Sequence, residues 1–165
     1  INQKEIKMEE IAFDDIDALN ATAGEEWSDW GPEFELSQEK INAFADLTGD
    51  HQWIHIDEEK AAAGPFGTTI AHGFFTLSLV PVLSLMLEGS SGLRLKGFQN
   101  VINYGGDRLR FLAPVPAGST VHARTRTKEA KAHKAGTLLS TEVAIHVKGS
   151  ETPSVLYESL SLFQG

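Results

Sequence analysis

The apolar and polar positions of this chain divide it into a first half with helical spacing and a second half with strand spacing. After Ser91, apolar residues tend to alternate with polar ones, which is the period of a β-strand. The alternation over 142–147 is typical of a half-buried antiparallel strand. The pattern predicts strands at 95–104, 107–114, 119–131, 137–149 and 154–163, with turns at 133–136 and 148–153 joining neighbours.

The first half predicts helices with recognisable ends. Residues 37–49 place apolar side chains on one face, with Ser37 as the N-terminal cap and Gly49 as the stop. Residues 57–64 predict a second short helix that begins at Asp57 and ends at Gly64. A short helix is also expected within 13–24, and a short strand within 30–37.

The longest apolar segment, residues 70–89, predicts a central helix that begins near His72 and Gly73. Its apolar residues cover nearly every face, so the helix should be buried. Pro81 should remove a backbone hydrogen bond and bend it. The fold class is therefore α+β, with an antiparallel sheet wrapped around a long buried central helix. Five strands leave open sheet edges, and pairing two copies in a homodimer would cover some of them.

Length and composition bound the class of protein. A chain of 165 residues suggests one domain over 1–165, in which 1–24 forms a peripheral N-terminal segment. The absence of cysteine excludes disulfides and thiolate metal sites and fits a cytoplasmic protein. A net charge of -9 disfavours nucleic acid as a partner. No apolar run is long enough to span a membrane, so no membrane partner is expected.

The segment "GDHQWIHID" (49–57) carries the strongest chemical signal. Asp50 follows the predicted end of a helix, and His55 lies five positions later. A carboxylate and an imidazole held around one water suit general acid–base chemistry, with Trp53 and Ile54 anchoring the loop. The alternative is a solvated loop, because polar residues after a helix are common.

The segment "TTIAHGFF" (68–75) predicts a second chemical feature at the start of the central helix. Backbone N–H groups in a first helical turn lack intrahelical partners, and the helix dipole favours negative charge there. The N–H of Gly73 is therefore a candidate oxyanion donor. The alternative is that Gly73 only permits close packing of the helix on the sheet, and His72 is expected to be structural.

Two further features are weaker. Asn103, Tyr104, Arg108 and Arg110 surround a glycine pair, and the arginines could meet phosphates, although a solvated outer face is the simpler interpretation. The six histidines lack a compact metal-ligand spacing such as HExxH, so no metal site is expected.

Taken together, "FADLTGDHQWIHIDEEKAAAGPFGTTIAHGFFTLSL" and "NYGGDRLRFLAPVPAGS" resemble the MaoC-like dehydratases, the (R)-specific enoyl-CoA hydratases of the hot-dog fold. The variant "GDHQWIH" is most similar to the nodulation-protein-N-like branch. The similarity runs from about Trp30 to the last strand. It implies a lyase that reversibly adds water to trans-2-enoyl thioesters, within a homodimer or a larger assembly of dimers.

The resemblance also implies roles for individual residues. The catalytic pair carries over to Asp50 and His55, and the oxyanion donor to the N–H of Gly73. Gln52 and Trp53 stand where the family usually has Asn and Pro, and Gln52 can still support the substrate through hydrogen bonds.

The resemblance further places Asn103 and Tyr104 at the substrate entrance. It implies no cofactor, since the acyl group arrives as a CoA or acyl-carrier-protein thioester. Two alternatives stay open: a hot-dog thioesterase, and an acyl-CoA-binding protein without turnover.

Overall fold

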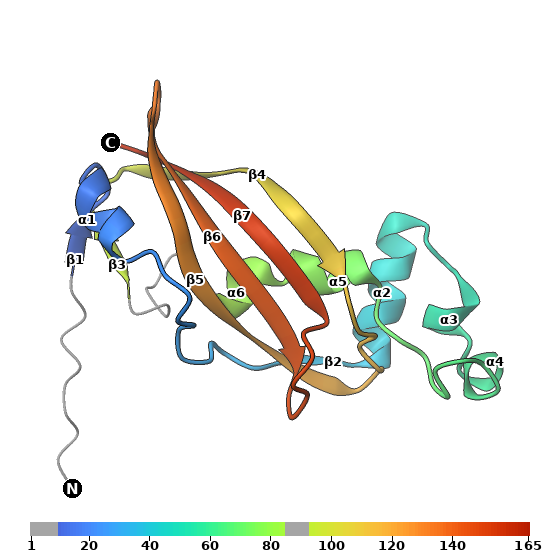
Figure 1. Ribbon diagram of the computed structural model, residues 1–165. Helices are drawn as coiled ribbons and strands as arrows, with labels where there is room; N and C mark the ends of the chain where they lie inside the picture. The colour runs from blue at the N-terminus through green and yellow to red at the C-terminus, as the bar shows by residue number, and fades with distance from the viewer. Residues whose placement is uncertain (1–9, 85–92) are drawn as a thin grey trace, which may run out of the picture.

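A five-stranded antiparallel sheet dominates the computed structural model, which describes residues 10–84 and 93–165 (Figure 1). The strands lie in the order β2-β5-β6-β7-β4. A separate parallel pair, β1 and β3, lies at the other end of the sheet from α2. Their bounds are β1 Glu10–Ala12, β2 Phe34–Leu36, β3 Arg94–Lys96, β4 Asn100–Phe111, β5 Ser119–His133, β6 Gly136–Val147 and β7 Val155–Gln164. The predicted α+β class is confirmed.

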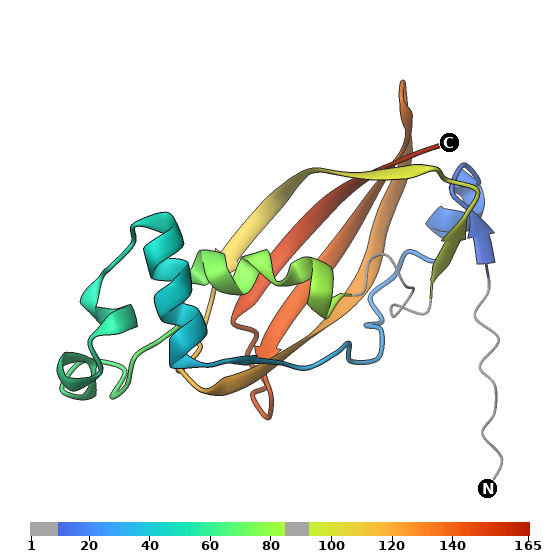
Figure 2. The same cartoon turned by 180° about the vertical axis from the view of Figure 1, so that it is seen from behind.

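Apart from α1, which lies with β1 and β3, the helices lie on one side of this sheet and at the other end of it. Figure 2 shows α5 and α6 running along the concave face, with α2, α3 and α4 gathered beyond one end. Their bounds are α1 Ile16–Ala21, α2 Gln38–Thr48, α3 Trp53–Ile56, α4 Glu58–Ala62, α5 Gly73–Ser78 and α6 Val80–Leu83. Within the described parts of the chain, none of these helices is long and apolar enough to cross a membrane.

The predicted helix over 37–49 is confirmed, including both of its ends. The hydroxyl of Ser37 accepts a hydrogen bond from the Lys40 N–H. Gly49 ends the helix in the left-handed conformation, with φ of 79°, which glycine adopts at low cost. The helix over 57–64 is also confirmed as α4, whose first turn is capped by the Asp57 carboxylate.

The central helix differs from its prediction. It begins at Gly73 as expected, but it is interrupted at Leu79, and α6 restarts at Val80. Pro81 lies in the first turn of α6, where a missing N–H costs little, so it marks a restart rather than a bend within one helix. Phe74 and Val82 are exposed, so burial on all sides is wrong for this single chain. The predicted part over 85–89 lies outside the described residues.

The predicted strands 95–104 and 107–114 also need correction, because Asn100–Phe111 forms one long strand, β4. The Gly105–Gly106 pair does not break it. A Cβ atom at Gly106 would collide with the ring of Tyr157 on the neighbouring strand, whose hydroxyl donates to the Gly105 carbonyl. The glycines therefore make room for a cross-strand tyrosine. The remaining three predicted strands and both turns agree with the structure.

Two apolar cores hold the fold together. The main core lies between α5, α6 and the concave face of the sheet and includes Leu79, Leu83, Val121, Val143 and Ile145. The second core lies beneath α1 and contains Leu19, Ala130, Leu139 and Phe163.

The outer face of the sheet is partly covered, which the alternation did not predict. Ala144 and His146 are buried, although the pattern over 142–147 places them on the outer side of a half-buried strand. The segment before β2 runs beside β5, and its Trp30 stacks on His122 and meets His146 edge-on. A chain segment far away in sequence thus supplies the cover.

Candidate active site

Asp50 is placed by the end of α2. Gly49 turns the chain, and Asp50 follows as an exposed residue in the next loop. Its carboxylate accepts a long hydrogen bond from the Gln52 N–H, at 3.4 Å. This local turn fixes the direction in which the chain enters α3.

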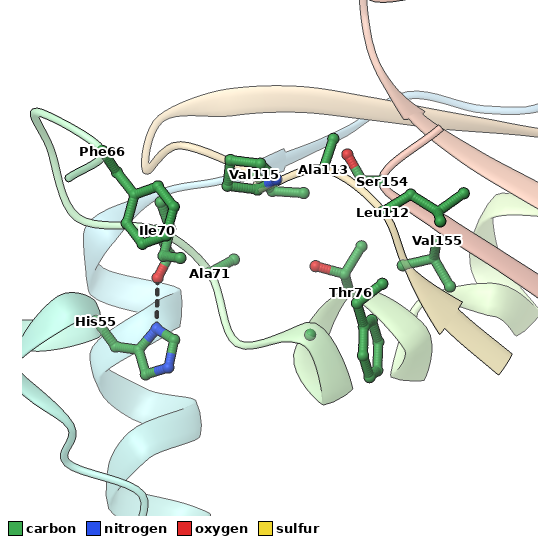
Figure 3. A pocket seen from close by; sticks show the side chains of 13 residues that line it. His55, Phe66, Ile70, Ala71, Thr76, Leu112, Ala113, Val115, Ser154 and Val155 are labelled. Atoms are coloured by element: carbon green, nitrogen blue, oxygen red, sulfur yellow. Dashed lines mark hydrogen bonds between the residues drawn. The ribbon is translucent and has the colours of Figure 1, made fainter. Parts of the chain in front are cut away.

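His55 is turned inward by the single turn of α3. Its side chain is buried, and its Nδ1 donates to the Ile70 carbonyl at 2.7 Å (Figure 3). A carbonyl can only accept, so Nδ1 carries the hydrogen and Nε2 keeps its lone pair in the neutral ring. The Ile70 N–H in turn donates to the Ile54 carbonyl at 3.0 Å. The backbone of Ile70 thereby fixes both the ring orientation and the tautomer of His55.

A side-chain amide on α2 clamps the same loop from the other side. Gln38 Nε2 donates to the His55 carbonyl at 2.7 Å and to the Asn42 side chain at 2.8 Å. The Thr69 hydroxyl donates to Gln38 Oε1 at 2.5 Å. One partly buried amide therefore ties α2, α3 and the segment before α5 together.

Trp53 anchors the loop at the position where the family usually has proline. Its ring packs so closely on Gly64 that a Cβ there would lie 2.9 Å from it. The Lys60 ammonium lies 4.9 Å from the ring centroid. Gln52 is exposed and forms the residue before α3. The two departures from the family pattern therefore leave Asp50 and His55 close to each other.

Asp50, His55 and His72 form one cluster. A carboxylate oxygen of Asp50 and one ring nitrogen from each histidine all lie within 4.8 Å of one another. Burial lowers the pKa of His72 below its ordinary value, and the neighbouring His55 lowers it further, although a hydrogen bond to the Asp50 carbonyl opposes both. His72 is therefore neutral at physiological pH.

The cluster is a poor fit to a metal ion despite its two imidazoles and one carboxylate. The rings of His55 and His72 are stacked at 3.8 Å with an interplanar angle of 28°. Imidazole lone pairs lie in the ring planes, so nearly parallel rings direct them side by side rather than toward one tetrahedral centre. The expectation of no metal stays a prediction.

A cavity of about 270 Å³ opens beside His55 and the N-terminus of α5. Figure 3 shows His55, Phe66 and Ile70 on one side of it and Thr76, Leu112 and Val155 on the other. Its walls are mostly apolar. Gly73 also lines it, and a Cβ on that glycine would lie 2.8 Å from the Phe111 ring. As the first residue of α5, Gly73 has an N–H without an intrahelical partner.

The weaker candidates lie elsewhere. Asn103 lines a second cavity, of about 470 Å³, between α5, α6 and strands β4 and β7. Tyr104 is exposed, with its ring 5.4 Å from that of His133, and it lines neither cavity. Arg108 is exposed, and its Nη1 lies 3.5 Å from Oε2 of Glu158. Arg110 is also exposed. A single chain thus does not bring these residues beside His55.

Sequence reasoning missed Gln38. It is the first residue of α2, and nothing in its surroundings in the sequence distinguishes it from a surface glutamine. His72 lies in the Asp50–His55 cluster, and the expectation that it has a structural role stays a prediction.

Residues 21–148 match the family described as MaoC like domain. The chain is 46% identical to 3-hydroxyacyl-thioester dehydratase Z of Mycobacterium tuberculosis, over 90% of this chain and 95% of the relative. It is 37% identical to nodulation protein N of Rhizobium meliloti, covering 95% and 94% of the two chains.

Among solved structures, the monoamine oxidase regulatory protein from Archaeoglobus fulgius superimposes with a TM-score of 0.73 at 24% identity, covering 96% of this chain and 98% of that one. This likeness supports the hot-dog fold. The predicted resemblance, including that to nodulation protein N, is confirmed. The chain belongs to the MaoC-like dehydratase domain family.

Proposed function

We propose that the protein is an (R)-specific enoyl-CoA hydratase, or 3-hydroxyacyl-thioester dehydratase, that reversibly adds water to trans-2-enoyl thioesters. One observation carries the proposal: the Asp50 carboxylate approaches His55, and His55 lines an apolar cavity together with Gly73 at the N-terminus of α5. The relative at 46% identity is named 3-hydroxyacyl-thioester dehydratase Z.

In the hydration direction, Asp50 and His55 hold one water and remove a proton from it. The water oxygen attacks C3 of the enoyl group, and a proton is returned to C2, so one water is added across the double bond. His55 Nε2 is the ring nitrogen free to accept a proton, because Nδ1 is committed to the Ile70 carbonyl. The exposed Asp50 carboxylate remains available as the second acceptor.

The developing charge determines the role assigned to Gly73. When water adds to C3, negative charge builds on the thioester oxygen, and the Gly73 N–H would donate to it. One such donor typically contributes about 10²–10³-fold to the rate, and a positioned acid–base group about 10²–10⁴-fold.

The substrate would be carried as a CoA or acyl-carrier-protein thioester, with no further cofactor. The apolar walls of the cavity suit an acyl chain. Gln52, Asn103 and Tyr104 remain proposed substrate contacts. The expected cytoplasmic location also stays a prediction.

We further propose that the protein works as a homodimer. Strand β4 is an edge strand of twelve residues, and in the described part of the chain it pairs with β7 alone. Large exposed apolar side chains gather on this strand, just after it, and on α5 and α6: Phe74, Val82, Ile102, Tyr104, Phe111 and Leu112. Pairing of two β4 edges would cover both the open edge and this surface. Ile102→Asp should yield monomers in analytical ultracentrifugation, and a wild-type monomer would contradict the proposal.

The activity is tested by following loss of enoyl-thioester absorbance when the protein is mixed with crotonyl-CoA and then with longer enoyl-CoAs. The expected product is the (3R)-3-hydroxyacyl thioester, identified by chiral chromatography. Release of free CoA thiol without hydration would favour the thioesterase. Tight binding of acyl-CoA with no chemical change would favour the binding protein.

A further inference from the structure

His72 contacts each part of the proposed catalytic apparatus while lining neither cavity. Its Nε2 lies 2.9 Å from the main-chain oxygen of Asp50. Its ring stacks on that of His55, with centroids 3.8 Å apart. It immediately precedes Gly73 as the N-terminal cap of α5, and its carbonyl accepts the first hydrogen bond of that helix, from Thr76.

The hydrogen bond to Asp50 fixes the tautomer of His72. A main-chain oxygen only accepts, so Nε2 carries the hydrogen and Nδ1 has the lone pair. Nδ1 is buried and has no hydrogen-bond partner among residues 10–84 and 93–165. A proton placed there would bury an N–H without an acceptor, which is costly. This agrees with the lowered pKa of His72, whose main cause is burial. His55 carries its hydrogen on the opposite nitrogen, Nδ1.

We propose that His72 is a positioning residue, which holds the Asp50 backbone and the His55 ring in register with the Gly73 N–H. Its own main chain is fixed in the first turn of α5, so its side chain transmits the position of that helix to the catalytic loop. The ring also contacts Phe44 of α2, at 5.1 Å between centroids, which limits its rotation. The contacts of the His72 side chain with the Asp50 main chain and the His55 ring place it to act through these two neighbours.

The inference rests on the proposed hydratase function, and one part of its test does not. In ¹⁵N-imidazole spectra of the ligand-free protein at neutral pH, His72 should show the Nε2–H tautomer and His55 the Nδ1–H tautomer. The resonances are assigned by comparison with His72→Gln and His55→Gln. A His72 ring that carries its hydrogen on Nδ1, or that is charged, would overturn the inference even if the protein proves to be a hydratase.

The kinetic part separates the hydrogen bond from ring packing. His72→Phe keeps a ring but loses the donor, and kcat for crotonyl-CoA should fall about 10²-fold, as expected when catalytic groups shift by about 1 Å. KM should be unchanged. His72→Gln can place an amide N–H where Nε2 lies and should recover most of the loss, whereas His72→Ala should not.

His122 supplies a matched control, since its ring also stacks face to face, on Trp30 at 3.8 Å. His122→Phe and His122→Gln should leave kcat unchanged. A His72→Phe protein that melts like the wild type and keeps its kcat would overturn the inference. So would a His72→Gln protein as slow as His72→Ala, or a loss confined to KM. If His72→Phe fails to fold, His72→Gln and the tautomer measurement still decide it.

Discussion

The chain contains two pairs of neighbouring histidines, and they lie in contrasting surroundings. His55 and His72 stack on each other at 3.8 Å near the N-terminus of α5. His122 and His146 are cross-strand partners on the outer face of the sheet, where both contact Trp30. In each pair, burial lowers the pKa of at least one ring.

The two pairs differ in the groups and cavities that lie beside them. The inner pair lies within 4.8 Å of the Asp50 carboxylate, and His55 lines a cavity. The outer pair lines neither cavity, and burial is the main cause of its lowered pKa values; Glu33 raises the pKa of His122, whereas Lys148 and Arg124 lower it. Packed imidazoles alone therefore do not define a site. A space for substrate and an available backbone N–H distinguish the first pair from the second.

The largest expected difference between the pairs is in turnover. His55→Ala should lower kcat/KM for crotonyl-CoA by about 10²–10⁴-fold, because it removes a positioned acid–base group. His146→Ala should leave it unchanged once the folded fraction is matched by circular dichroism. Equal losses at both positions would show that the variants act through folding.

Gly73→Ala should lower the rate because it adds a methyl group to the wall of the cavity beside His55. The added Cβ would lie 2.8 Å from the Phe111 ring, so the ring or the helix start must move. A shift of about 1 Å typically costs about 10²-fold in rate. Steady-state kinetics of Gly73→Ala and of Gly73→Ala with Phe111→Ala check the cause. Recovery of kcat in the double variant would show that the clash with the Phe111 ring causes the loss. No recovery would show that the residue 73 N–H is displaced for another reason.

Gln38→Ala should destabilise the loop that holds His55 and leave His122 and His146 unaffected. It removes the hydrogen bonds to the His55 carbonyl and from Thr69, leaving partly buried groups unpaired. The free energy of unfolding should fall by about 1–3 kcal/mol, measured in urea, and kcat should fall with it. Asn42→Ala removes the exposed third contact of Gln38 and should have a smaller effect on both.

The smallest expected effect concerns pH and the outer pair. The pKa of His146 is lowered in the folded protein, mainly by burial, from an ordinary value of 6.5. The unfolded chain therefore binds more protons there, so stability falls as pH drops through 6.5 toward the folded pKa. His146→Gln should flatten the decline in unfolding free energy measured from about pH 7.5 to about pH 5.5. An unchanged slope would remove His146 from this account.

The features predicted well from sequence were those set by local chemistry. Ser37 and Gly49 define α2 because a hydroxyl cap and a left-handed glycine act within a few residues. The same helix end delivers Asp50, so its approach to His55 could be predicted from the spacing. The strands β5, β6 and β7 followed from alternation and two turns.

The features that could not be predicted depend on contacts distant in sequence. Gly106 looks like a turn until Tyr157 is seen packed against it from the neighbouring strand. His146 looks half-exposed until Trp30 covers it. The orientation of His55 depends on the carbonyl of Ile70 and the amide of Gln38. The sequence around each of these residues does not predict its distant partner.

The central claim is that Asp50 and His55 act on one shared water, and a double-variant cycle tests it most directly. Hydration of crotonyl-CoA would be measured for the wild type, Asp50→Asn, His55→Ala and the double variant, all with matched folded fractions. Since residues that act as a unit are strongly non-additive, the double variant should be hardly slower than the slower single variant. Losses that multiply in the double variant would contradict the shared water.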